Sequence, residues 1–582
     1  MLRSSRSRHT TRLWCSCICA ALLLACAASP SQRDERARTE VASPEITLSI
    51  IGTNDLHGHV DRTAVLAGFL ENLRKKRAAD NGDVLLVDGG DLFQGTLESN
   101  LGEGSVIVEA YNALGYDAAT VGNHEFDFGP EGLAATATGD EDPRGALKAR
   151  ARQANFPFLS ANIVEKSSGE RFGSPLIPPS VLLEKKGVKI GLIGVSTEDT
   201  PYTTLAANFR GLMMRSVRDT LVEEARKLRA KGASVIVALA HAGGHCASCH
   251  DANDTGSCDA DDEIFQVAHQ LPAGSVDVIV AGHTHASVAH RVNGIAIIES
   301  WSLGRGFGRV DVRVAPDAKA PSSIRIFPPT ELCQSPTTRV ADCEPEDYEG
   351  HSVEIDSRIL EVIQPAFDKA EKQRNVALGV KLVTPVPRGY AAESPLGNLF
   401  ADLMLRSNPS ADVAITNSGG LRADLPQGLL TYGSLFEAMP FDNRFAFTTV
   451  KAKDLSSIIA KNLAESNGFL LISGVRAVAT CEKGRIRIVL EKRDGQRLDE
   501  NEALKLVTSD FLAGGGDSAF APAALTMRDF EISDVLIRDA MIAELQKQGG
   551  DLGVNDAAFY DRDDPRVAYP GKRPVRCSPV TP

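Results

Sequence analysis

The sequence has no surplus of positive charge. Its 63 Lys and Arg residues stand against 76 Asp and Glu residues, so the formal net charge is -13 over 582 residues. Nucleic-acid backbones bind to basic protein surfaces. We therefore exclude nucleic-acid binding as the main task. A small phosphorylated substrate stays possible, because bound metal ions can make a local site cationic.

Cysteine is also scarce. Four of the 11 cysteines lie within the first 26 residues, which leaves seven. Seven is too few for a scaffold built on disulfides, although an exported chain can form some. Because seven is odd, one thiol is left over after pairing within the chain. The seven are Cys246, Cys249, Cys258, Cys333, Cys343, Cys481 and Cys577.

Long hydrophobic runs are missing. The apolar run from Leu13 to Leu24 follows several arginines and is shorter than the roughly 20 residues that span a bilayer. It is typical of a signal peptide. Its end, Leu-Leu-Ala-Cys26, resembles the bacterial lipobox, with ordinary cleavage after small residues as the alternative. We expect a signal peptide over 1–25, a tether over 26–45, lipidation of Cys26, and an exported protein anchored to the membrane of a bacterial envelope (periplasm or outer membrane).

At this length the chain predicts more than one domain. Apolar runs alternate with amphipathic stretches from Glu45 to about residue 312, which is typical of a layered α/β domain. Residues 316–351 are rich in Pro, Asp, Glu and Ser, and 355–374 have helical spacing. A second mixed α and β domain follows. The expected boundaries are 46–315 for the first domain, 316–377 for a linker with a connecting helix, and 378–565 for the second domain.

Five apolar runs of the first domain end in residues that bind metals or transfer protons. Open α/β sheets place their sites at the carboxyl ends of strands, so we expect these ends to meet in one crevice. Imidazole, carboxylate and amide groups together suit divalent ions such as Zn, Mn or Fe. The runs are ITLSIIGTNDLHGH, DVLLVDGGDLF, DAATVGNHEFDFG, ASVIVALAHAGG and VDVIVAGHTHA.

The blocks GTNDLHGH, DGGDLFQG, GNHEFDFG and AGHTH resemble, in this order, those of the calcineurin-like metallophosphoesterases. Within that group the chain is similar to the exported 5′-nucleotidase and UDP-sugar hydrolase family over about residues 46 to 525. The resemblance implies a four-layer α/β/β/α metallophosphoesterase domain and an α/β substrate-recognition domain. It also implies two divalent ions, Zn, Mn or similar. One would be held by Asp55, His57, Asp91 and His285, and the other by Asp91, Asn123, His241 and His283, with Asp91 as the bridge.

The same resemblance gives His124 a catalytic role without a metal. It would stabilise the transition state and protonate the leaving oxygen, with Asp127 orienting its ring. The neighbouring Glu125 is interpreted as a carboxylate at the start of a helix.

The second domain resembles the nucleotide-recognising half of the same family. In relatives two aromatic rings hold the base, polar residues contact the nucleoside and an arginine reaches the substrate's charge. The motifs ITNSGGLRADL, EAMPFDNRF and TSDFLAGGGDSAF supply Asn417, Arg422, Phe441, Asn443, Phe511 and Asp517. The chain departs from relatives at Tyr390, where they carry an arginine, and Arg388 is the candidate replacement.

We therefore expect hydrolysis of nucleoside 5′-monophosphates, with pyrophosphate cleavage of UDP-sugars as a second activity. A 2′,3′-cyclic-nucleotide 2′-phosphodiesterase with 3′-nucleotidase activity is the first alternative, although the two phenylalanines favour 5′-nucleotides. A thiosulfohydrolase shares the metal domain, and the nucleotide motifs argue against it. A non-catalytic nucleotide- or haem-binding surface lipoprotein would require a broken metal ligand, and none of the ligand positions is broken.

The string Cys246-Ala-Ser-Cys249-His250 has the spacing of a haem attachment site. Its surroundings are too polar and glycine-rich to bury a porphyrin, so we expect no haem. A disulfide from Cys258 to Cys246 or Cys249 is favoured, with the third thiol free or paired with Cys333 or Cys343. The alternative is a zinc site of Cys246, Cys249 and His250 with Cys258 or His245 as fourth ligand.

Overall fold

The computed structural model describes residues 45–132, 136–137, 139–334, 340–553 and 560–577. The expected signal peptide, the tether up to residue 44 and the lipidation site Cys26 lie outside these ranges. Within them, every helix is too short or too polar to cross a bilayer.

The first domain is built on two stacked six-stranded sheets, with the orders β14-β13-β1-β2-β3-β4 and β11-β12-β10-β9-β7-β6. Both sheets are apolar on their inner faces, where Leu48 and Leu85 of one meet Leu192, Val237 and Val280 of the other. The strands of the first sheet are β1 (Ile46–Thr53), β2 (Asp83–Asp88), β3 (Ala118–Thr120), β4 (Phe158–Leu159), β13 (Gly306–Val314) and β14 (Ser323–Glu331). Those of the second are β6 (Ser180–Lys185), β7 (Val188–Ser196), β9 (Val235–His241), β10 (Val278–Ala281), β11 (Ser287–Val292) and β12 (Ile295–Ser300).

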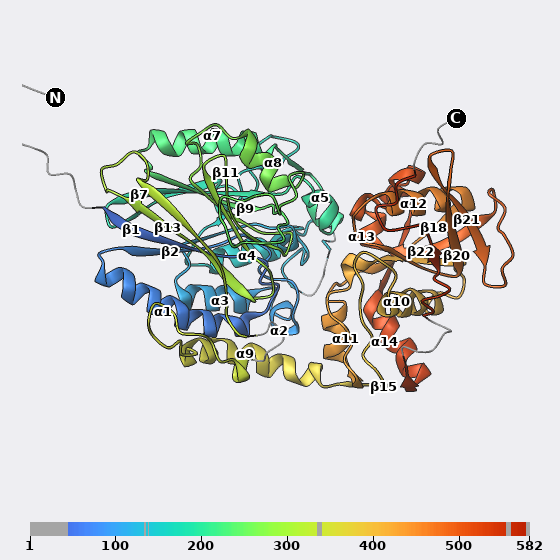
Figure 1. Cartoon of the computed structure of the whole chain (residues 1–582). Coiled ribbons are helices and arrows are strands. Elements are labelled where there is room, and N and C mark those ends of the chain that lie inside the picture. Colours follow the sequence, from blue (N-terminus) through green and yellow to red (C-terminus); the bar gives the residue numbers. More distant parts are fainter. Residues whose placement is uncertain (1–44, 133–135, 138, 335–339, 554–559, 578–582) are drawn as a thin grey trace, which may run out of the picture. The chain divides into compact units, whose positions relative to one another are not determined.

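Helices cover the outer faces of both sheets (Figure 1). Buried residues of α1 (Thr63–Ala79), α3 (Ser105–Leu114) and α9 (Ser357–Arg374) form one outer core with the first sheet. Those of α7 (Val217–Ala230) and α8 (Glu263–Gln270) form the other with the second sheet. Helix, sheet, sheet and helix thus follow one another, which confirms the predicted four-layer fold.

Short elements fill the connections of this domain. They are η1 (Val60–Arg62), α2 (Leu97–Asn100), η2 (His124–Phe126), α4 (Gly145–Gln153), β5 (Ile163–Glu165), α5 (Thr200–Thr203), α6 (Ala206–Phe209), β8 (Leu212–Met214) and η3 (Val340–Asp342).

The segment expected to be a linker, 316–377, contains a strand. Within it, β14 pairs with β13 in antiparallel register and forms an edge of the first sheet. Alternating Ile324 and Ile326 pack against the core between the sheets. The adjacent Pro328 and Pro329 suggested a loop, but an edge strand tolerates proline because one row of its N–H groups has no partner strand. The helical spacing over 355–374 corresponds to α9.

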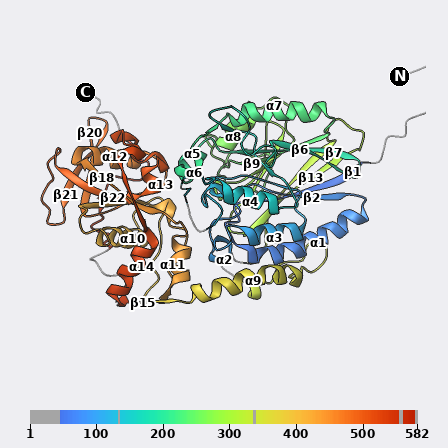
Figure 2. The same cartoon turned by 180° about the vertical axis from the view of Figure 1, so that it is seen from behind.

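The second domain has a five-stranded sheet of order β19-β16-β22-β18-β23 with helices packed on it (Figure 2). The sheet consists of β16 (Val413–Asn417), β18 (Arg444–Lys451), β19 (Leu470–Ser473), β22 (Ala503–Ser509) and β23 (Glu531–Leu536). The helices are α10 (Pro395–Arg406), α11 (Tyr432–Ala438), α12 (Ala452–Ala464), α13 (Asp510–Ala513) and α14 (Ile537–Gln548), with short turns η4 (Ser418–Gly420), η5 (Gly516–Ser518), η6 (Ala521–Ala523) and η7 (Met527–Asp529). Two small sheets comprise β15 (Ala377–Leu382), β17 (Gly428–Thr431) and β24 (Gly550–Leu552), and β20 (Val475–Glu482), β21 (Arg485–Lys492) and β25 (Val567–Ala568).

This domain continues past the expected end at residue 565. The strand β25 pairs with β20, and a disulfide joins Cys481 to Cys577. The described residues of both domains belong to one compact unit.

Candidate active site

The predicted strand ends meet at one place. Loops after β1 and β2 are tied together, because the backbone N–H of Asp55 donates to the carbonyl of Gly90 at 2.9 Å and that of His57 to Asp91 at 3.0 Å. From the second sheet, His241 ends β9 and reaches the same loop, donating from Nδ1 to the carbonyl of Gly89 at 2.9 Å. The two sheets therefore contribute to one cluster of side chains.

Two groups of metal-ligating atoms lie in this cluster. In each group the atoms are within 4.8 Å of one another. One comprises Asp55, His57 and His285, and the other Asp91, His241 and His283.

Asp91 lies between the two groups. Its Oδ2 is 3.1 Å from Nε2 of His241 and 3.8 Å from Nε2 of His57. Asn123 joins the second group, with Oδ1 2.9 Å from Nε2 of His241. Its amide nitrogen donates to the carbonyl of Thr203 at 2.9 Å, which directs the oxygen toward the cluster.

The donor set fits divalent cations. Nδ1 of His57 donates to the carbonyl of Gln94, so the hydrogen-bond network assigns the lone pair of this ring to Nε2. Nδ1 of His241 donates to the carbonyl of Gly89, which turns Nε2 toward Asp91 and Asn123. Nε2 of His57 faces Nε2 of His285 at 3.0 Å, and the buried Oδ1 of Asp55 has no hydrogen-bond partner among the described residues. Acceptors that converge in this way are stabilised by a cation between them.

The backbone is also strained at this cluster. Five ligand candidates have a positive φ, which is uncommon for residues other than glycine and concentrates at functional sites. They are Asp55 (50°), His57 (47°), Asp91 (59°), His283 (82°) and His285 (57°).

The charge states are consistent with metal ligation. Burial lowers the pKa of His283 to about 3 and that of His57 well below its usual range, so both rings are neutral. Burial would also lower the pKa of His241, but the adjacent Asp91 raises it to about 10. A cation at Nε2 would take the place of that proton.

His124 lies beside the cluster and is held at both ring nitrogens. Nδ1 donates to Oδ2 of Asp127 at 2.5 Å, and Nη2 of Arg422 from the second domain donates to Nε2 at 2.8 Å. The other oxygen of Asp127 accepts from the hydroxyl of Thr204 at 2.9 Å. Burial would lower the pKa of His124, but Asp127 and Asp91 raise it above its usual range.

Glu125 lies in the first turn of η2, as the sequence interpretation has it, but its carboxylate has a further role. It is buried and accepts backbone N–H groups of Gly122 at 2.7 Å, Leu92 at 2.7 Å and Asp91 at 3.0 Å. Burial raises its pKa to about 7. Glu125 therefore braces the loop that carries Asp91 from a different segment of the chain, a role that the sequence interpretation did not include.

Sequence reasoning missed a second brace, Glu299. Its buried carboxylate accepts from the hydroxyl of Thr284 at 2.7 Å and from the backbone N–H groups of Ala286 at 3.2 Å and Gly244 at 3.3 Å. It thereby holds the loop that carries His283 and His285. Its one sequence signal was a carboxylate directly after the four apolar residues that begin strand β12.

A cavity of about 1540 Å³ opens beside the cluster and is lined by both domains. Asp55, His57 and His241 are buried behind its wall, whereas the other ligand candidates line it. Every residue predicted to bind substrate also lines it, namely Arg388, Asn417, Arg422, Phe441, Asn443, Phe511 and Asp517.

Contacts on the second-domain wall order these residues. Nδ2 of Asn417 donates to Oδ2 of Asp517 at 2.7 Å. The ring of Phe441 lies 5.7 Å from that of His124, and the guanidinium of Arg422 lies 5.4 Å from the Phe441 ring. Arg388 is exposed and donates to the carbonyl of Leu421 at 2.8 Å, and the 56% exposed Tyr390 lines the cavity nearby.

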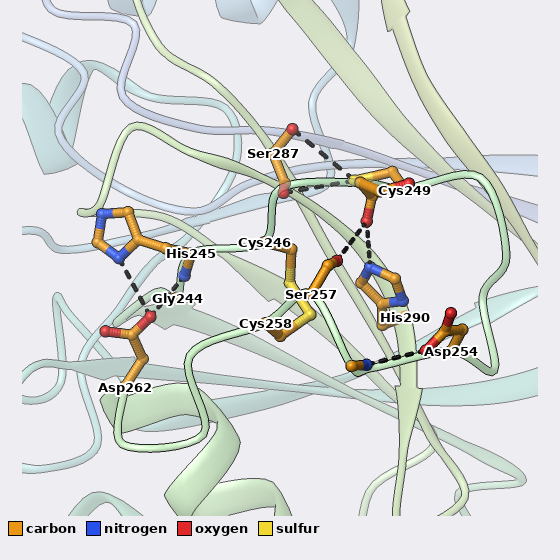
Figure 3. The surroundings of a disulfide bond; sticks show 12 residues. Gly244, His245, Cys246, Cys249, Asp254, Ser257, Cys258, Asp262, Ser287 and His290 are labelled. Atoms are coloured by element: carbon orange, nitrogen blue, oxygen red, sulfur yellow. Dashed lines mark hydrogen bonds and ion pairs between the residues drawn. A yellow bond between two sulfur atoms is a disulfide. The ribbon is translucent and has the colours of Figure 1, made fainter.

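A disulfide loop starts at the edge of the cavity, and His245, Asp259 and Asp262, which flank the loop in sequence, line the cavity. Figure 3 shows the loop closed by a bond between Cys246 and Cys258, with Cys249 as a free thiol near Ser287. The favoured disulfide interpretation is thus the one that the structure shows. Cys333 pairs with Cys343, so neither of them is the partner of Cys249.

Known families match both domains. Residues 48–287 match the calcineurin-like phosphoesterase family, and residues 376–524 match the 5′-nucleotidase, C-terminal domain family. The fold and the site together define the chain as a phosphate-ester hydrolase of the calcineurin-like class. Its second domain is similar to the C-terminal domain of 5′-nucleotidases.

Individual relatives span both domains. The chain is 27% identical to protein UshA of Yersinia enterocolitica, covering 81% of this chain and 86% of that protein. It is 26% identical to a 5′-nucleotidase of Vibrio cholerae, covering 85% and 89%.

Solved structures share the fold. The 5′-nucleotidase precursor of Thermus thermophilus has a TM-score of 0.67 at 22% identity, covering 88% of this chain and all of that one. The sulfate thiohydrolase SoxB of the same species has a TM-score of 0.66 at 16% identity, covering 91% and 98%. Since enzymes of two different activities share this architecture, the fold does not select the substrate.

Proposed function

We propose that this protein hydrolyses nucleoside 5′-monophosphates to nucleoside and phosphate. One observation carries the proposal: a single cavity is lined by Asp91 and His124 from the first domain and by Phe441 and Phe511 from the second. A phosphate at the first pair and a base at the second would occupy the same cavity. This geometry suits a phosphate attached to a flat ring system.

The proposed cofactors are two divalent ions, Zn, Mn or similar. One ion would be held by Asp55, His57 and His285. The other would be held by His241, His283 and Asn123. Asp91 would contribute to both sites. When bound, such a pair binds phosphate oxygens and lowers the pKa of a water molecule. Burial of the ligands and their hydrogen bonds to backbone carbonyls fix the side chains before the ions bind.

His124 is the proposed proton donor to the leaving oxygen. Asp127 accepts the proton of Nδ1, so the proton to be donated would be carried by Nε2, on the ring's other side, once Arg422 has moved to the substrate. Arg422 now occupies the hydrogen-bonding position of Nε2, and its guanidinium is placed to bind phosphoryl oxygens once substrate is present. The Arg422 side chain would then donate its hydrogen bond to a phosphoryl oxygen of the substrate in place of Nε2 of His124.

The proposed nucleoside site is the opposite wall. Phe441 and Phe511 would stack on the base, a contact that every base can make. Asn417 and Asp517, already paired with each other, would contact the nucleoside together with Asn443. At the edge, Arg388 would supply the positive charge that relatives place at the position of Tyr390.

Cleavage of UDP-sugars is a proposed second activity. The cavity volume of about 1540 Å³ exceeds the roughly 300–1,000 Å³ of common ligand pockets. It therefore has room for a nucleoside diphosphate with a sugar attached.

Export to the bacterial envelope is also proposed. Three disulfides in the described residues support it, because such bonds persist in oxidising compartments. Lipidation of Cys26 would then anchor the protein to the membrane. Cys26→Ala should move the protein from the membrane fraction to the soluble envelope fraction, and unchanged membrane association would contradict the anchor.

The decisive experiment compares substrates on the purified, metal-loaded protein. We expect the highest kcat/KM with 5′-AMP, lower values with UDP-glucose, and little turnover of 3′-AMP or 2′,3′-cyclic AMP. Activity should vanish with a chelator and return with Zn or Mn. A preference for the cyclic nucleotide or 3′-AMP would replace the proposed function by the 3′-nucleotidase alternative. If the protein releases phosphate from none of these nucleotides, the non-catalytic nucleotide-binding alternative would stand instead.

A further inference from the structure

The backbone around Phe441 is held through its carbonyl groups. Pro440 has no N–H, so this short segment cannot be fixed by backbone donors at that position. Arg538 of the same domain donates from Nη1 to the carbonyls of Met439 and Phe441, both at 3.2 Å. The carbonyl between them, that of Pro440, is left for other donors.

Two side-chain amides of the first domain donate hydrogen bonds to the carbonyl of Pro440. Nε2 of Gln94 and Nδ2 of Asn100 each donate to the oxygen of Pro440 at 3.2 Å. Both belong to the segment that follows Asp91, and Gln94 is 2% exposed. One carbonyl oxygen, with two lone pairs, thus receives two hydrogen bonds from the domain that carries the metal ligands.

Gln94 also contacts one of the metal-ligand candidates directly. Its backbone carbonyl accepts the hydrogen bond from Nδ1 of His57 at 2.9 Å. A single residue therefore orients a metal-ligand candidate through its main chain and the segment of Phe441 through its side chain. Asn100 completes the contact, since its Oδ1 accepts the backbone N–H of Gly95 at 2.9 Å and so fixes the loop beside Gln94.

From this arrangement we infer that Gln94 and Asn100 are positioning residues that set the distance between the phosphate site and the Phe441 ring, and thereby the preference for nucleotides. The inference rests on the proposed function, because it assigns Phe441 to the base. Neither amide needs to touch substrate. Each acts through the Pro440 carbonyl, one bond away from the residue whose ring lies 5.7 Å from the ring of His124.

Two near-isosteric variants test the inference. Gln94→Met keeps the volume and the backbone carbonyl but removes the donor. Asn100→Asp keeps the acceptor for Gly95 and also removes the donor. Gln364→Met is the control, because Gln364 lies exposed on α9 and does not line the cavity, whereas the donors to the Pro440 carbonyl within the described ranges are Gln94 and Asn100.

We expect Gln94→Met and Asn100→Asp each to raise KM for AMP about three- to tenfold, the scale of one hydrogen bond. The value of kcat with AMP should change less than about twofold, which is the scale of a substitution away from the reacting groups. The same limit should hold for kcat and KM with p-nitrophenyl phosphate and for the amount of bound metal. Gln364→Met should leave all of these constants unchanged.

A double-mutant cycle with Phe441→Ala identifies the route. If the amides act through Phe441, Gln94→Met should add little to the KM of Phe441→Ala. Suppose that Phe441→Ala does raise KM for AMP. Any of three results then overturns the inference: the effects on KM are fully additive, the amide variants lose as much activity with p-nitrophenyl phosphate as with AMP, or both amide variants keep the wild-type KM for AMP. If Phe441→Ala itself leaves KM for AMP unchanged, the proposed nucleoside site is wrong and the inference falls with it.

Discussion

Arg422 and His124 lie 298 positions apart in the chain, yet the guanidinium of the first donates a 2.8 Å hydrogen bond to Nε2 of the second. The arginine belongs to the second domain, and the histidine lies beside the cluster of metal-ligand candidates. This contact brings a permanent positive charge to the place where a phosphoryl group is proposed to react.

Loss of the Arg422 charge should affect turnover strongly. We expect Arg422→Met to lower kcat/KM for AMP about 100-fold, the scale of removing one charged donor from a developing anion. Arg388→Met is the matched control at the edge of the cavity and should cost less than about tenfold. Steady-state kinetics on both variants give the comparison. An equal loss in the two variants would show that Arg422 supplies only general positive charge.

The proposed bridging role of Asp91 predicts a larger loss of activity than the removal of Arg422. Asp91→Asn should lower kcat by about a thousandfold or more, because it weakens both metal sites at once. Metal analysis should show fewer than two ions per chain, and circular dichroism should show an intact fold. Wild-type hydrolysis of AMP under limiting metal would refute the bridged assignment.

Thr204 is expected to act through Asp127. Thr204→Val removes the hydroxyl that donates to Oδ1 of Asp127. Since His124 is oriented by the other oxygen of that carboxylate, kcat should fall about three- to tenfold while KM stays constant. Thr203→Val is the control, because its hydroxyl donates to carbonyls of its own turn and its backbone still holds Asn123. Equal losses in both variants would mean a structural effect on the turn.

The two phenylalanines should affect binding more than chemistry. Phe441→Ala and Phe511→Ala are each expected to raise KM for AMP about tenfold, the scale of one base-stacking contact, with kcat changed little. With p-nitrophenyl phosphate, which lacks a base, neither constant should change much. Losses of the same size on both substrates would assign the rings to the core.

Glu125 should contribute to stability and metal retention. Glu125→Gln places an amide nitrogen against one or more of the backbone N–H groups that the carboxylate accepts. We expect the free energy of unfolding to fall by about 1–3 kcal/mol and the metals to bind more weakly. The exposed Glu71, changed to Gln, should leave both quantities unchanged. Thermal unfolding with and without added metal measures the difference.

The sequence predicted the ligand candidates because their signal is local. Asp55, His57 and Asp91 directly follow apolar runs, and the rule that strand ends converge applied to both sheets. The four-layer fold followed from the family resemblance that these same motifs carry. Cys258 could be paired with Cys246 or Cys249 because the three share one short loop, and the structure selects Cys246.

The supporting contacts could not be predicted in this way. Glu299 and Gln94 act on segments that come close only after both sheets and the second domain have folded. The spacing of residues in the sequence does not indicate which backbone N–H or carbonyl group each side chain will hydrogen-bond. The edge strand β14 was missed for another reason, since Pro328 and Pro329 carry a loop signal that an edge position overrides.

The helix α9 separates two inherited tasks along one chain. The metal-ligand candidates and His124 precede it, and the proposed base-binding residues Phe441 and Phe511 follow it. Mutations after residue 376 that spare Arg422 can therefore alter which substrate is bound while the hydrolytic centre stays intact, a freedom that a lineage can exploit when its substrates change. The same separation offers a laboratory route to new specificities, in which positions 388–517 other than Arg422 are randomised and every ligand candidate is left untouched.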